Sequence, residues 1–373
     1  MKTTILKHSS SWRLLQSNSL QQLSRLLAPV GGLLSLLLIG SGATLAIRYG
    51  TASTSAEAPL PLTTPAGMIL TAPVNQQPDT TQPKPSYWRP PADAQIPVGE
   101  TGKQIRYGRV LVAHTAKYLG PNGSVRHISN GMNCQNCHLE AGTKVLGNNY
   151  SGVFSTYPKF RERSGSVESV VKRITDCFER SLSGKGPDSN SREMKAMVAY
   201  MKWLGTGVPS GKRPEGAGLV KLPYLDRAAD PETGKLVYAA KCQSCHGSKG
   251  EGVRLPGTAQ YTYPPLWGPH SYNDGAGIYR LTSFAGYVKN NMPFGATYER
   301  PQLTDAESWD VAAFVNSMPR PHKDQSHDWP DIRTKPVDFP YGPYADTFSE
   351  KQHKFGPYQP IVEAKKATGS PVK

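Results

Sequence analysis

Hydrophobic residues follow three different patterns along this chain of 373 residues. Residues 26–47 form a run without any charge, residues 51–100 show no sustained period, and from residue 102 onward amphipathic segments alternate with Gly- and Pro-rich loops. A helix made of the uncharged run would be roughly 33 Å long, which is enough to cross the ~30 Å hydrocarbon core of a bilayer. The patterns predict an N-terminal membrane-spanning or signal helix, an extended linker and a compact helical remainder.

The N-terminal segment, residues 1–50, carries the signals for export. All charged side chains before the uncharged run are basic, which is typical of the cytoplasmic flank of a membrane helix. We therefore expect the chain after Arg48 on the periplasmic side of a bacterial inner membrane. The small residues Ala43 and Ala46 also offer cleavage points for a signal peptidase, so an anchor and a cleaved signal both stay open. Residues 51–100 are rich in proline and are expected to form an extended spacer.

Two segments, residues 101–210 and 211–320, show the same order of elements. Each has a helical stretch, a cysteine motif, a Gly/Pro-rich loop and a terminal amphipathic helix. The first terminal helix is predicted to be capped by Asn190 with Glu193, and the second by Thr304 with Glu307. Apolar residues at helical spacing follow both caps: Met194, Met197, Val198, Met201 and Leu204 in the first, and Trp309, Ala312, Ala313 and Phe314 in the second. The sequence therefore predicts an all-α fold with two tandem domains.

The C-terminal segment, residues 321–373, shows no clear helical period. It carries many aromatic residues for a free tail: Trp329, Phe339, Tyr341, Tyr344, Phe348, Phe355 and Tyr358. Side chains of this size are normally buried in part. We expect the tail to wrap back over one of the domains.

Four of the five cysteines form two copies of one motif. The copies are Cys134-Gln-Asn-Cys137-His138 and Cys242-Gln-Ser-Cys245-His246. C-x-x-C-H is the attachment signature of c-type haem, in which both thiols bond to the porphyrin and the histidine ligates the iron. A zinc site made of four cysteines would leave both histidines unexplained, and a thioredoxin-like pair would need an α/β pattern. The sequence predicts two covalently bound haems c and two class I cytochrome c-like domains, with His138 and His246 as iron ligands.

The second iron ligand of each haem decides whether the haem carries electrons or reacts. In the second domain the candidate is Met292, in a Met-Pro loop before the terminal helix, with Lys289 as a nearby competitor. The first domain has no such loop, and its candidate is the fifth cysteine, Cys177. Val167, Val170, Ile174 and Cys177 recur at helical spacing, which places Cys177 on the buried face of a helix. A lone buried cysteine is often only a small hydrophobic residue, and Met194, Met197 and Met201 are rival ligands.

Basic residues are dense around Cys177. They are Lys159, Arg161, Arg163, Lys172, Arg173, Arg180 and Lys185. Such a run is usually a solvated face, but Arg173 lies one helical turn before Cys177, where it can line the mouth of a site. Guanidinium groups bind sulfonate, carboxylate and phosphate oxygens in a forked geometry. The whole chain has 43 Lys+Arg against 28 Asp+Glu, a net charge of +15. The charge favours anionic partners, and because blocks of five or more bases are absent, nucleic acid is not expected among them.

The chain resembles dihaem thiosulfate dehydrogenases of the TsdA family over most of residues 88–361. The resemblance is carried by NGMNCQNCHLEAGT, by Tyr157-Pro158, by RITDCFERS (residues 173–181) and by KPVDFPYGPYADTFSEKQHKFGP in the tail. It implies that Cys177 is the distal ligand of a first, catalytic haem, and that Arg163, Arg173 and Ser181 belong to the substrate pocket. Met292 matches the methionine ligand of the second haem. In some members a lysine stands beside that methionine and exchanges with it, but here Asn291 occupies the position.

The family implies that the protein oxidises two thiosulfates to tetrathionate, in a reaction that can in principle run backwards. Electrons would pass from the first haem to the second and on to an external acceptor such as a small c-type cytochrome. A non-catalytic dihaem electron carrier is the alternative, and it would need neither a labile distal ligand nor an arginine pocket. A dihaem peroxidase would need a distal acid and base, which we do not identify in the sequence.

Overall fold

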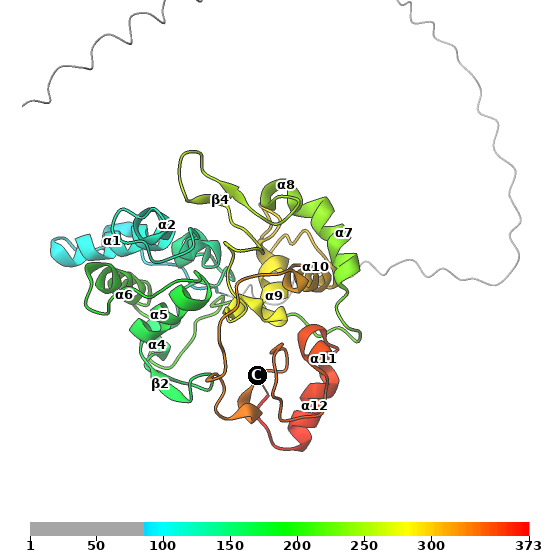
Figure 1. Ribbon diagram of the computed structural model, residues 1–373. Coiled ribbons are helices and arrows are strands. Elements are labelled where there is room, and N and C mark those ends of the chain that lie inside the picture. Colours follow the sequence, from blue (N-terminus) through cyan, green and yellow to red (C-terminus); the bar gives the residue numbers. More distant parts are fainter. Residues whose placement is uncertain (1–85, 373) are drawn as a thin grey trace, which may run out of the picture. The chain divides into compact units, whose positions relative to one another are not determined.

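The computed structural model describes residues 86–372 (Figure 1). The expected anchor or signal helix at residues 26–47 and most of the spacer lie outside the described residues. Within residues 86–372 no helix is both long enough and apolar enough to cross a membrane.

The first domain is built on two helices that cross closely. These are α1 (Glu100–Ala113) and α6 (Arg192–Leu204), and at their crossing a Cβ atom on Gly108 would lie only 2.0 Å from the Ala196 carbonyl oxygen. Only glycine therefore permits this approach. The shorter elements between them are α2 (Thr115–Leu119), α3 (Leu139–Gly142), α4 (Val153–Thr156), α5 (Val170–Arg180) and the antiparallel hairpin of β1 (Lys159–Arg161) with β2 (Ser166–Glu168).

The second domain repeats this arrangement. Helix α7 (Pro231–Lys241) crosses α10 (Asp305–Ser317), and a Cβ atom on Gly234 would lie 1.9 Å from the Asp310 carbonyl oxygen. Between them lie α8 (Gln243–His246), the hairpin of β3 (Val253–Arg254) with β4 (Tyr261–Tyr263), and α9 (Leu281–Asn291). The predicted mainly helical fold with two like domains is confirmed, and the two short hairpins are additions that the all-α prediction did not contain.

The helix starts were predicted with unequal success. Thr304 caps α10, and Glu307 completes the predicted capping box. The cap predicted at Asn190 is wrong by one residue, because the Ser191 hydroxyl accepts the Met194 N–H, whereas the Asn190 N–H is bound to Asp188. Val167 does not belong to the helix of Cys177 either. It lies in β2 with its side chain 67% exposed, since Ser169 caps the helix and starts it at Val170.

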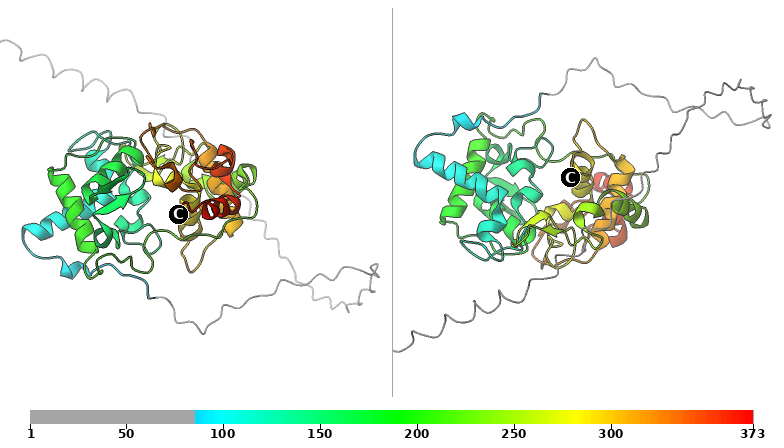
Figure 2. Two further views of the ribbon diagram at one scale, coloured as in Figure 1. Left: turned by 90° about the horizontal axis from the view of Figure 1, so that it is seen from below. Right: turned by 90° about the horizontal axis from the view of Figure 1, so that it is seen from above.

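The tail is helical in part, against the prediction. It forms α11 (Glu350–Phe355), capped by Ser349, and α12 (Gln359–Ala367). It also contacts both domains rather than one: Arg280 of the second domain donates to Asp338 at 2.8 Å, and Arg180 of the first donates to Asp328 at 2.7 Å. The views in Figure 2 show the tail helices beside the second domain. Short helices of this kind depend on tertiary packing, and therefore leave a weak periodic signal in the sequence.

Helix α9 brings the two domains together at the cysteine motif of the first. The Tyr287 hydroxyl donates to the Asn136 carbonyl at 2.8 Å, and the Asn291 amide donates to the Leu146 carbonyl at 3.1 Å. Both acceptors lie within or just after the first C-x-x-C-H segment. The end of α9 that leads to Met292 is therefore fixed against the first domain. The domain boundaries proposed from the sequence stay a prediction.

Candidate active site

The first cysteine motif is held in a short turn of 3-10 helix, Cys134–Asn136. Asn133 and Asn136 bond each other's backbone around this turn, and the Cys134 N–H donates to the Thr115 hydroxyl at 3.0 Å. All five cysteines of the chain are described and each has a free thiol. Burial raises the pKa of the Cys134 thiol to about 11 and that of Cys137 to about 12. Both thiols line the cavity in front of His138.

His138 is oriented by the loop that follows it. Its Nδ1 faces the carbonyl oxygen of Asn148 at 2.5 Å, and burial lowers the pKa of the imidazole to about 4. The Tyr150 ring lies against it with ring centroids 4.4 Å apart, in space that a side chain at Gly142 would occupy. A neutral imidazole whose Nδ1–H donates to a carbonyl presents its Nε2 lone pair to a metal. The residues present thus fit the proximal ligand of a haem.

His246 in the second domain is likewise oriented by a backbone carbonyl. Its Nδ1 faces the Pro264 carbonyl oxygen at 2.8 Å, and burial again lowers the pKa of the imidazole. The neighbouring Cys242 is a free thiol whose pKa burial raises to about 11. The second motif therefore has the same donor set and the same orientation of its histidine, and it too fits a covalently bound haem.

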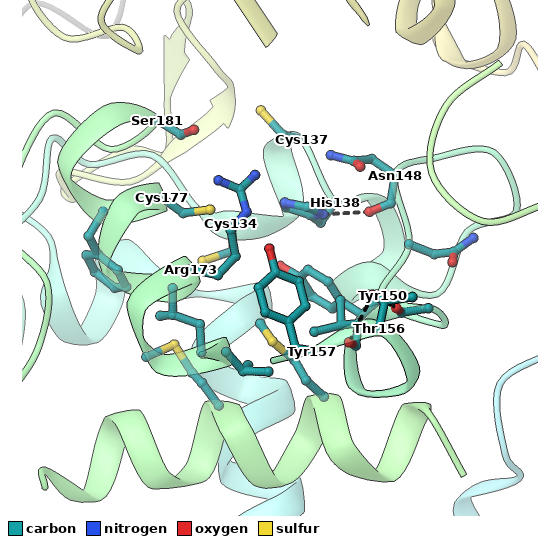
Figure 3. A pocket seen from close by; sticks show the side chains of 18 of the residues that line it. Cys134, Cys137, His138, Asn148, Tyr150, Thr156, Tyr157, Arg173, Cys177 and Ser181 are labelled. Atoms are coloured by element: carbon teal, nitrogen blue, oxygen red, sulfur yellow. Dashed lines mark hydrogen bonds between the residues drawn. The ribbon is translucent and has the colours of Figure 1, made fainter. Parts of the chain in front are cut away.

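A cavity lies in front of His138 (Figure 3). Its volume is about 230 Å³. Cys134, Cys137 and His138 line it from one side, and Cys177 lines it from α5. The cysteine motif and the lone cysteine, which lie 39 or more residues apart in the sequence, therefore share one cavity.

Cys177 and Arg173 act on each other inside this cavity. Figure 3 shows the Cys177 sulfur pointing into the cavity from α5, with the Arg173 guanidinium between it and His138. The negative charge of a Cys177 thiolate is the largest cause that raises the pKa of Arg173. Cys177 also contributes, after burial, to the raised pKa values of Cys134 and Cys137. Of the three rival methionines, Met197 and Met201 also line the cavity, whereas Met194 is fully buried outside it.

The lining of the cavity is strongly cationic. It includes Lys159, Arg161, Arg173 and Arg213, and none of its residues is an aspartate or glutamate. Arg213 was not predicted as a site residue. It stands in the Gly-, Pro- and Lys-rich segment of residues 208–223 between α6 and α7, called the interdomain linker below, where only the adjacent pair Lys212-Arg213 hints at a basic surface. Cations without carboxylates in one concave site favour an anionic ligand.

The remaining predicted pocket residues are placed differently. Ser181, the C-terminal cap of α5, lines the cavity. Arg163 does not: its guanidinium donates to the Gly275 carbonyl at 3.1 Å, lies 3.9 Å from Asp328 and packs over the Trp329 ring. Arg163 therefore lies at the contact with the second domain and is not among the residues that line this cavity, and its role toward the substrate stays a prediction.

Met292 follows directly on α9 and is partly buried, and its role as an iron ligand stays a prediction. Its competitor Lys289 is engaged elsewhere. The Lys289 ammonium pairs with Asp305 at 2.7 Å and donates to the Leu303 carbonyl at 2.8 Å. Asn291, beside Met292, is bound to the first domain through Leu146.

Both domains match known families of cytochrome c sequences. Residues 125–210 match the SoxA/TsdA cytochrome c domain, and residues 231–319 match cytochrome c. The chain is similar to the thiosulfate dehydrogenase of Psychrobacter arcticus, with 40% identity over 255 residues, 68% of this chain and 74% of that protein. Similarity to the thiosulfate dehydrogenase of Allochromatium vinosum is 40% over 235 residues, 62% of this chain and 83% of that one. The thiosulfate dehydrogenase of Stutzerimonas stutzeri is 37% identical over 236 residues, which cover 63% of this chain and 74% of that protein.

A solved structure shows the same likeness. The thiosulfate dehydrogenase TsdBA of Marichromatium purpuratum superposes with a TM-score of 0.59 at 33% sequence identity. The match covers 64% of this chain and spans half the length of that one. Taken with the two cysteine motifs and the cavity shared by His138 and Cys177, these relationships show that the chain belongs to the thiosulfate dehydrogenase (TsdA) family of dihaem cytochromes c.

Proposed function

We propose that this protein carries two covalently bound haems c and couples two thiosulfates into tetrathionate. Cys134, Cys137 and His138 would hold the first haem, and Cys177 would complete the ligands of its iron. Cys242, Cys245 and His246 would hold the second haem, and Met292 would complete the ligands of its iron. The observation that carries the proposal is the cavity in which a proximal histidine, a lone cysteine and four cations meet without any carboxylate.

The reaction forms one sulfur–sulfur bond and releases two electrons. Two thiosulfate dianions give one tetrathionate dianion, and no proton or oxygen atom is gained or lost. The haems supply one-electron acceptors when they are bound, and a thiolate ligand lowers a haem potential whereas a methionine ligand raises it. With both haems bound, electrons would leave through the second domain to an external acceptor such as a small c-type cytochrome, and the reaction could also run backwards.

The residues of the chain have to overcome repulsion between the substrates. Two unit charges 4 Å apart repel by about 4 kcal/mol at an effective dielectric constant of 20, so two dianions repel by on the order of 16 kcal/mol. Arg173 lies beside Cys177, and its positive charge offsets the charge of the first substrate. The Ser181 hydroxyl, one helical turn after Cys177, is available to donate to a sulfonate oxygen. Fixed cations of this kind stabilise charge without reorganisation.

We place the protein on the periplasmic side of the inner membrane, either anchored by residues 26–47 or released after cleavage. The support is the uncharged run with only basic residues before it. Separating membranes from the soluble periplasmic fraction, and sequencing the mature N-terminus, distinguishes the two forms.

Purified holoprotein with thiosulfate and an artificial electron acceptor tests the function. We expect one tetrathionate for every two electrons delivered, and two haems per chain by mass spectrometry. A protein that carries both haems and accepts electrons from other reductants, yet leaves thiosulfate unchanged, would instead be an electron carrier.

A further inference from the structure

The interdomain linker contributes one residue, Arg213, to the wall of the cavity. We infer that Arg213, together with Arg161, makes a second anion subsite at the cavity mouth that binds the second thiosulfate. This inference rests on the proposed function, and it adds a subsite to the one formed by Arg173, Ser181 and Cys177.

Hydrogen bonds fix the linker on both sides of Arg213. Before it, the Gly211 N–H donates to the Ser155 carbonyl and the Ser155 hydroxyl donates to the Lys212 carbonyl, both at 2.6 Å. After it, the Gly218 carbonyl accepts the Asn148 N–H at 2.9 Å. Asn148 is the residue whose own carbonyl orients His138. The backbone on either side of Arg213 is therefore held by Ser155 of α4 and, at Gly218, by the loop that positions the proximal histidine.

Two glycines leave room for the Arg213 side chain. A Cβ atom on Gly152 would lie 3.3 Å from Arg213 Cγ, and one on Gly218 would lie 2.7 Å from a terminal guanidinium nitrogen. Gly218 has a φ of +79°, which glycine adopts without strain. The side chain of Arg213 thus extends along backbone without side chains, and Arg213 is one of the residues that line the cavity.

The two subsites differ in depth and in their supporting elements. Arg173, on α5, is partly buried beside Cys177, whereas Arg213 is exposed. Arg161, at the end of β1, lines the same cavity as both. Tetrathionate carries one sulfonate at each end, so a product formed from two substrates needs an anion-binding group at each end. A deep and an outer guanidinium in one cavity satisfy that requirement.

The adjacent Lys212 supplies a matched control. It has the same charge, but it does not line the cavity, and its contact with Ser155 uses the backbone carbonyl. Arg213→Ala, Arg213→Lys and Lys212→Ala would be compared with the unmodified holoprotein. Binding of tetrathionate to the fully oxidised protein, measured by calorimetry, involves no electron transfer, and the KM for thiosulfate is measured separately.

We expect Arg213→Ala to weaken tetrathionate binding and to raise the thiosulfate KM by about 10-fold, since one charge-assisted bond at an exposed site is lost. Arg213→Lys should recover part of this loss, and Lys212→Ala should stay within about twofold, as a surface charge outside the site would. The haem spectra and unfolding temperatures of all variants should match.

The inference is overturned if the unmodified protein is active and Arg213→Ala is indistinguishable from Lys212→Ala in both measurements. If the unmodified protein neither oxidises thiosulfate nor binds tetrathionate, the proposed function itself fails, and the subsite fails with it. A rise in KM in Arg213→Ala with unchanged tetrathionate binding would also overturn it, because the outer group would then act on entry rather than on the product end.

Discussion

The two domains share a scaffold but differ in the helix that lies between the haem-binding motif and the last helix of the domain. In each, a glycine lets the first helix of the domain cross the last, at Gly108 in one and Gly234 in the other. In each, the histidine is neutral, with its Nδ1 bound to a backbone carbonyl. The first domain then adds α5, which brings Cys177 and Arg173 into a cationic cavity. The second has α9, whose last residues are fixed against its neighbour.

The segments that would bind haem are alike in the two domains, and the segments that would select a reaction differ. The histidine geometry is the same in both domains, so it cannot distinguish a catalytic site from an electron-transfer site. The difference lies in the segment after the motif. In the first domain this segment provides the Cys177 thiol and several cations. In the second it contains Met292 and a lysine, Lys289, that is paired with Asp305. Substitutions in these segments should therefore affect the two domains separately.

The largest expected effect is that of Cys177→Gly. We expect thiosulfate oxidation to fall by on the order of 10³-fold or more, as with the loss of other essential active-site groups, while both haems stay attached. Steady-state assays and the haem content by mass spectrometry would be measured together. Retention of full activity would contradict the assignment, and a methionine-type spectrum from the first domain of the unmodified protein would point to Met197 or Met201.

Arg173→Ala should have the next largest effect. A hydrogen bond to a charged group contributes about 1.5–3 kcal/mol, so kcat/KM for thiosulfate should fall by about 10- to 150-fold. Arg173→Lys should recover part of the activity, since it keeps the charge but not the forked geometry. Arg163→Ala is the matched comparison, because Arg163 is bound to the tail outside the cavity and its loss should affect the thiosulfate KM far less. Equal losses in the two variants would show that Arg163 also reaches the substrate.

Met292→Leu tests the second domain alone. Removal of the thioether should lower the potential of the second haem, within the ~0.8 V range that axial ligands span, and slow turnover several-fold. The thiosulfate KM should not change, because Met292 does not line the cavity of the first domain. Spectroelectrochemical titration separates the two haems. A change confined to the first haem would contradict the assignment of Met292.

The smallest effect on catalysis is expected where the domains are alike. Gly108→Ala and Gly234→Ala should each lower the free energy of unfolding by about 1–3 kcal/mol, because the new methyl group would overpack a helix crossing. Gly277→Ala is the control, since a Cβ atom there would meet nothing within 4 Å. Thermal unfolding of the holoproteins measures the difference. If the free energy of unfolding changed in only one of the two variants, the packing at the two helix crossings would differ although their backbones are similar.

Local features of the chain could be predicted because their physical cause is local. Covalent haem attachment needs two thiols and a histidine within five residues, so both motifs can be recognised in the sequence without knowledge of the fold. The capping box of Thr304 and Glu307 was predicted correctly for the same reason, since its bonds span three residues. The helices of the tail were missed because α11 and α12 are short and are stabilised by packing rather than by their own period.

The composition of the cavity depended on tertiary structure. Its cations come from β1, α5 and the linker, and only the fold brings Arg213 to the site. The fold also places Arg163 outside the cavity, beside Asp328 of the tail. Asp328 pairs with Arg180 as well, and it lies 148 residues beyond Arg180 in the chain. Sequence by itself determined which chemistry the protein contains: two haem sites, a lone thiol and an excess of positive charge. Tertiary structure decided which charges face the thiol, because contacts between residues distant in the chain have no periodic signature in it.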